Sequence, residues 1–75
     1  MKDLNIIISE VFDIEEKEIG PELKRNITPE WDSFNHLILI SEIETKLEAK
    51  FSMSEVEEIL NYNDLVELVK IKKQL

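Results

Sequence analysis

Apolar residues recur at helical spacing near the N-terminus of the chain. They are Leu4, Ile7, Ile8, Val11 and Phe12. Steps of three and four residues place them on one face of a helix, with polar residues on the opposite face. The pattern predicts a first amphipathic helix, with Asp3 near its start.

The segment from 13 to 32 does not keep this period. Its apolar residues are scattered among Gly20, Pro21 and Pro29, which interrupt regular structure. We interpret it as a long loop pinned to the core by apolar anchors. A structureless loop of this length is unusual in a compact domain and tends to be functional. The anchors are Ile14, Ile19, Leu23, Ile27 and Trp31.

A second helix is predicted over 33–50, where Asp32 or Ser33 can accept a hydrogen bond from the free amides of the first turn. Its apolar residues are too numerous for one buried face. Those of the predicted core stripe are Leu39, Ile40, Ile43, Leu47 and Phe51.

A different arc of the same helix carries Phe34, Leu37 and Ile38. We expect part of this second strip to face outward, flanked by the polar side chains of Ser41, Glu44 and Glu48. An apolar strip edged by acids is typical of a protein-docking surface. The alternative is that the long loop simply covers it.

Two more helices complete the pattern. A short third helix is predicted to begin at Ser54, which would cap it, and a last helix to begin after Asn61. Lysines crowd the C-terminal end of the last helix, where they complement its dipole. No segment alternates with period two. The pattern therefore predicts a single all-α domain over 1–75, a four-helix bundle with a long first loop and a short third helix.

Composition narrows the possible functions. The chain has no cysteine and one histidine, which excludes disulfides and leaves too few ligands for a thiolate or histidine metal site. Nine basic against seventeen acidic residues give a net charge of −8, which repels nucleic acid and anionic lipid and favours basic partners. No apolar run is long enough to span a membrane, and the N-terminus does not resemble a signal peptide. We expect a cytoplasmic protein.

Candidate chemistry gathers at the predicted start of the second helix. Asp32, Ser33 and His36 contain the residue types of a serine hydrolase, but an aspartate adjacent to the serine cannot orient the histidine as a triad requires. No nucleophile elbow accompanies them. A phosphate ester on Ser33 would be favoured by the free amides and the positive dipole end of the helix. The alternative role for Ser33 is that of a simple helix cap.

The segment Glu-Trp-Asp-Ser-Phe-Asn-His-Leu-Ile over 30–38 resembles the Asp-Ser-Leu phosphopantetheine attachment motif of acyl carrier proteins. The run over 43–51 is similar to the end of that family's second helix, and the resemblance covers essentially the whole chain. Four positions depart from it. Phe34 replaces the common leucine and Glu30 a frequent glycine, while Ile38 and Ser41 stand where fatty-acid carriers usually have an acid and a methionine or similar apolar residue. The Asp-Ser-Phe version is similar to D-alanyl carrier proteins, and the tryptophan before it to stand-alone carriers of specialised pathways.

The resemblance implies that Ser33 carries a 4′-phosphopantetheine arm, transferred from coenzyme A by a separate Mg²⁺-dependent phosphopantetheinyl transferase. It implies a non-catalytic, monomeric carrier of acyl thioesters for a lipid, fatty-acid or specialised biosynthetic pathway. Asp32 would help the transferase recognise the site. Acyl-transferring or acyl-activating enzymes with basic surfaces would dock on the second helix, at Phe34, Leu37, Ile38, Ser41, Glu44 and Glu48. The alternatives are a D-alanyl or an aminoacyl or peptidyl carrier, or an acidic interaction module without a prosthetic group.

Overall fold

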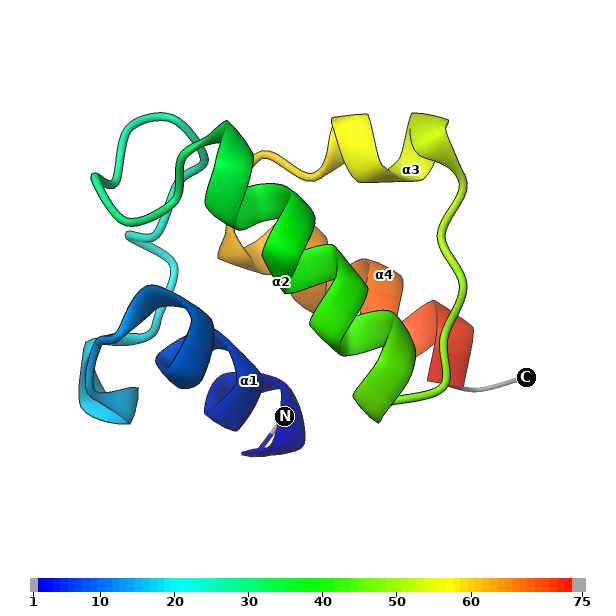
Figure 1. Cartoon of the computed structure of the whole chain (residues 1–75), viewed down its shortest axis with the longest axis horizontal. Coiled ribbons are helices and arrows are strands. Elements are labelled where there is room, and N and C mark those ends of the chain that lie inside the picture. Colours follow the sequence, from blue (N-terminus) through cyan, green and yellow to red (C-terminus); the bar gives the residue numbers. More distant parts are fainter. Residues whose placement is uncertain (1, 74–75) are drawn as a thin grey trace.

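The computed structural model describes residues 2–73. Its elements are α1 (Lys2–Phe12), a 3₁₀ turn η1 (Glu16–Glu18), α2 (Ser33–Lys46), α3 (Met53–Glu58) and α4 (Tyr62–Lys73). The predicted all-α architecture with four helices is confirmed, and the described residues form no strand beyond an isolated bridge between Lys24 and Asn61. Figure 1 shows α2 crossing the centre of the molecule, with α4 passing behind it and the short α3 at one end.

One apolar core joins the helices. The predicted stripe of α1 is buried except for Val11, which packs against the core, and Leu39, Ile40 and Ile43 of α2 are buried in the same core. The fully buried large side chains come from every part of the chain. They are Trp31, Leu4, Ile8, Leu39, Ile43, Ile59, Leu65 and Val69.

Two helix boundaries differ from the prediction. Helix α2 ends at Lys46 rather than near residue 50, because Glu48 adopts a left-handed backbone conformation (φ 55°) that a helix cannot contain. Helix α3 begins at Met53, because Ser52 rather than Ser54 is its cap. Ser52 accepts from the Glu55 amide while the Glu55 carboxylate accepts from the Ser52 amide, which forms a capping box. Asn61 caps α4 as predicted.

The long loop is tied to the connection between α3 and α4. The Arg25 amide donates to the Leu60 carbonyl over 2.8 Å, and the Tyr62 amide donates to the Leu23 carbonyl over 3.1 Å. Leu23 and Trp31 are buried anchors, as predicted. Ile27 is not an anchor, because its side chain is 75% exposed at the tip of the turns that precede α2.

Candidate functional site

Ser33 is the first residue of α2, and its neighbour supplies the cap. The Asp32 carboxylate accepts a hydrogen bond from the Asn35 amide over 2.8 Å. The Asn35 side chain in turn donates to the Glu30 carbonyl over 2.8 Å, which fixes the approach of the loop to the helix. Since Asp32 makes the cap, the hydroxyl of Ser33 is not needed for it. Ser33 is exposed to solvent.

The start of a 14-residue helix is a favourable place for a phosphate ester. The amides of the first turn point outward, and the aligned peptide dipoles leave partial positive charge at this end. An exposed hydroxyl in that position is accessible to another protein, and an anion attached to it lies in a stabilising field. The residues present therefore fit a covalent phosphate-linked group at Ser33.

His36, one turn further along α2, cannot serve Ser33 as a general base. Its Nδ1 accepts a hydrogen bond from the Trp31 indole over 3.0 Å, and its Nε2 lies 2.9 Å from the Val56 carbonyl oxygen. Both ring nitrogens are occupied, and the side chain is buried. A general base must reach the proton it removes. The arrangement thus excludes His36 as the group that activates the Ser33 hydroxyl.

The outward apolar strip of α2 has the exposure expected for it. Phe34 is 73% exposed, Leu37 is 60% exposed and Ile38 is 38% exposed. Together with Ser41 and Glu42 they line a shallow open hollow on the helix. The long loop does not cover this strip, so the alternative in which it was buried beneath the loop is wrong.

The acid that lines this hollow was not among the predicted flanking residues. The Glu44 carboxylate accepts from the Phe51 amide over 3.0 Å and holds the connection between α2 and α3. Glu48 lies beyond the end of α2. The acid that lines the hollow is Glu42, which also pairs with Lys46 over 3.1 Å. Helical spacing contains the signal for it, because Glu42 lies four residues after Ile38.

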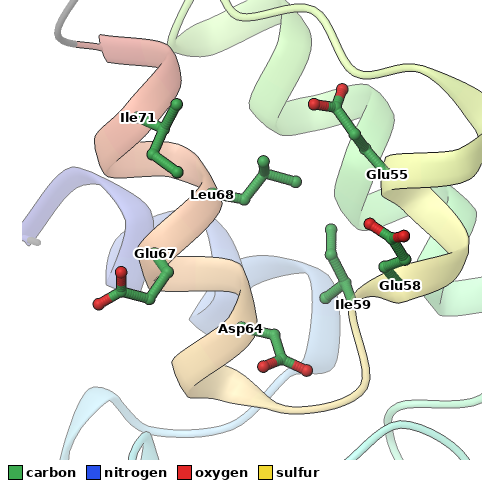
Figure 2. A pocket seen from close by; sticks show the side chains of 7 residues that line it. All are labelled: Glu55, Glu58, Ile59, Asp64, Glu67, Leu68 and Ile71. Carbon is green, nitrogen blue, oxygen red and sulfur yellow. The ribbon is translucent and has the colours of Figure 1, made fainter.

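Sequence reasoning also missed a groove between α3 and α4. Figure 2 shows acids around its rim and three apolar side chains on its floor. Two of the acids are engaged within the chain, since Glu55 pairs with Lys72 over 2.9 Å and Asp64 accepts from the Leu60 amide over 3.1 Å. The α4 residues of the groove follow helical spacing, which was the available signal. The groove is lined by Glu55, Glu58, Ile59, Asp64, Glu67, Leu68 and Ile71.

Two features are absent from residues 2–73. No helix in this range has the length and apolar character needed to cross a bilayer. No three histidine, aspartate or glutamate side chains in the same range are grouped so that they could hold a metal ion.

Comparison with known proteins adds one finding. No family model and no curated protein matches the chain. Among solved structures, the chain is similar to the solution NMR structure of holo acyl carrier protein from Geobacter metallireducens. The two share 32% sequence identity with a TM-score of 0.82, over 95% of this chain and 82% of that one. The agreement therefore extends through all four helices rather than a local motif.

Proposed function

The chain belongs to the acyl carrier protein family, and from this we propose that it carries acyl groups on a 4′-phosphopantetheine arm attached to Ser33. The observation that carries the proposal is the position of Ser33 as the first, exposed residue of α2, directly after the capping Asp32. The helix cap and the attachment point are different residues. Asp32 holds the helix start in place, so modification of the serine hydroxyl does not remove the cap.

In this proposal a separate transferase catalyses the attachment, because His36 is held by Trp31 and Val56 and cannot act as a base for Ser33. The Ser33 oxygen bonds to the phosphorus that bears the pantetheine part of coenzyme A. The diphosphate bond breaks, the adenosine bisphosphate part leaves, and the hydroxyl proton passes to a base of the transferase. Once bound, the group supplies a thiol that holds an acyl group as a thioester. In this proposal the chain itself is a carrier and not an enzyme.

The strip of Phe34, Leu37 and Ile38 is the surface we assign to partner enzymes. It begins at the residue that follows Ser33, so a protein that receives the arm must approach it. Exposed apolar side chains supply the buried area of such an interface, and the net charge of −8 favours a partner with a basic surface. Phosphopantetheinyl transferase and acyl-transferring or acyl-activating enzymes are the partner classes. We further propose that the carrier acts as a cytoplasmic monomer in a lipid or specialised pathway.

The test is an intact-mass measurement on the purified chain after incubation with a phosphopantetheinyl transferase, coenzyme A and Mg²⁺. The wild type should gain one phosphopantetheine mass, and Ser33→Ala should gain none. Ser54→Ala is a control, since Ser54 is also an exposed helical serine but lies on α3, away from the strip of Phe34, Leu37 and Ile38, and its loss should leave modification unchanged. Circular dichroism of each variant shows that the fold is retained. A mass gain in Ser33→Ala would refute the assignment of the residue. No gain in the wild type would favour an interaction module without a prosthetic group.

A further inference from the structure

A buried chain of hydrogen bonds joins three elements around the single histidine. The Trp31 indole N–H donates to His36 Nδ1 over 3.0 Å, and His36 Nε2 lies 2.9 Å from the carbonyl oxygen of Val56. Trp31 belongs to the long loop, His36 to α2 and Val56 to α3. Only 3% of His36 and 1% of Trp31 is exposed. The link between these three elements is therefore shielded from water.

These two partners fix the protonation state of the imidazole. An indole N–H can only donate and a carbonyl oxygen can only accept. Nδ1 must therefore be free of hydrogen, and Nε2 must carry one. A second proton would enter at Nδ1 and face the Trp31 N–H, so that two donors would meet at 3.0 Å. The neutral ring makes both hydrogen bonds, and the charged ring can keep only the one to Val56.

The surroundings also oppose protonation. Burial lowers the pKa of His36 below its ordinary value of 6.5; the hydrogen bond to Val56 raises it in part, and the charge of Arg25 lowers it further. Arg25 is the charged group that faces the ring from the loop, and its guanidinium donates to the Glu57 carbonyl over 2.8 Å. The other titratable side chains next to these contacts, those of Asp32 on the approach to α2 and Glu57 and Glu58 on α3, are exposed to solvent.

Two side chains thus hold consecutive carbonyls near the end of α3. His36 binds that of Val56, and Arg25 binds that of Glu57. Arg25 keeps its charge at every pH at which proteins fold, whereas histidine changes its charge between about pH 5 and 8. We propose that neutral His36 is a latch that fastens the end of α3 to the start of α2 and to the Trp31 loop, and that acid opens it. This inference goes beyond the carrier function and does not depend on modification of Ser33.

Opening the latch would change the surface of the molecule. Val56 and Ile59 are buried core residues, and both lie on the segment that His36 and Arg25 hold. Ile59 is also part of the floor of the α3–α4 groove in Figure 2. Release of this segment exposes apolar side chains and reshapes the groove, while the contact of α1 with α2 is left in place.

The experiment uses the unmodified full chain and its two unique reporters. Trp31 is the single tryptophan and His36 the single histidine, so the indole N–H and imidazole resonances are assigned without ambiguity. As the pH falls from 7.5, both resonances should shift with one common midpoint, which lies below about 6.5. Binding of an apolar dye should rise over the same range. An indole resonance that stays constant while the imidazole titrates would overturn the latch.

Two variants separate the latch from general acid sensitivity. His36→Gln offers one acceptor and one donor that do not titrate. Because the pKa of His36 is lowered in the folded state, the latch stabilises the fold fully above about pH 6.5 and loses this effect as the pH falls. The folded-to-unfolded ratio of the wild type should then decrease by up to about tenfold per pH unit relative to this variant. Trp31→Phe removes the indole donor to Nδ1, a hydrogen bond that only the neutral ring can accept, so the pKa of His36 should rise. Parallel pH profiles for wild type and His36→Gln, or an unchanged pKa in Trp31→Phe, would each refute the proposal.

Discussion

Truncating Leu37 and truncating Ile43 should have opposite consequences, although the two residues lie on the same helix. Ile43 lies on α2 and is fully buried in the core. Deletion of a buried isoleucine to alanine typically costs about 2–5 kcal/mol. The free energy of unfolding of a 75-residue chain is expected to be about 4–11 kcal/mol. Ile43→Ala should therefore remove a large fraction of the stability, which corresponds to a fall in Tm of about 10 °C or more.

Leu37 gives a much smaller loss of stability. Its side chain is 60% exposed, so about two fifths of its surface is removed from water on folding. Full burial of a leucine is worth about 1.5–3 kcal/mol, which scales to about 1 kcal/mol here. The higher helix propensity of alanine at an exposed position offsets part of that. Leu37→Ala should lower Tm by a few degrees at most.

The rate of acyl transfer should rank the two variants in the opposite order. Thermal and urea melts give the stabilities, and initial rates of transfer to a cognate acyl-transferring enzyme give the docking effect at a temperature where both variants are folded. Leu37→Ala should slow transfer severalfold or more, since an apolar side chain at an interface contributes on the scale of its buried area, less ordering costs. Folded Ile43→Ala should transfer at close to the wild-type rate. If Leu37→Ala unfolds as readily as Ile43→Ala, the strip is part of the core and the docking argument is wrong.

Three further outcomes are expected. Asp32→Asn keeps the cap and should leave the Tm unchanged, whereas Asp32→Ala should lower the free energy of unfolding in urea melts by about 0.5–2 kcal/mol. If the transferase recognises only the charge of Asp32, both variants should slow modification equally. Glu42→Lys should slow modification more at low salt than at high salt, and a salt-independent rate would exclude electrostatic docking at this face. The pKa of Glu55 is lowered, first by the hydrogen bond from the Ser52 amide and then by the contact with Lys72. The stability that these contacts add is present above about pH 4.5 and is lost as the pH falls through the lowered pKa. In melts below pH 4.5, the stability of Glu55→Gln should therefore depend less on pH than that of the wild type.

The helices could be predicted because their core faces are periodic in the sequence. The stripe of α1 and the two arcs of α2 are visible at steps of three and four residues. The structure buries Leu39, Ile40 and Ile43 and exposes the outer arc as expected. Leu47 and Phe51 of the predicted core arc lie beyond the end of α2 and are only partly buried. The cap of α3 was also available, because Ser52 and Glu55 have the spacing of a capping box. The end of α2 was not, since the left-handed backbone at Glu48 is carried by a residue type that gives no local signal for it.

The surroundings of His36 could not be predicted for a different reason. Its contact with Val56 spans 20 residues and exists only after α3 has docked. A histidine on a helix looks the same in sequence whether it faces solvent or a carbonyl of another element. Glu44 was assigned to the partner surface by helical spacing and by the family resemblance, and its bond to the Phe51 amide depends on where the chain turns after α2. Periodicity identifies the face of a helix, but the partner of a polar side chain depends on the tertiary fold.

The contacts of α3 differ in kind from those of the other helices. A six-residue helix is too short to be stable alone, so its position depends on what it touches. Its ends are held by polar contacts: the capping box at Ser52, the pair of Glu55 with Lys72, and the carbonyl contacts from Arg25 and His36. The contact of α1 with α2, by contrast, is built mainly from buried apolar side chains, with one exposed ion pair between Glu10 and Lys46. Acid and salt act on charges and hydrogen bonds but barely on apolar packing. The α3 side of the molecule should therefore respond to both, while the helix that presents Ser33 keeps its place.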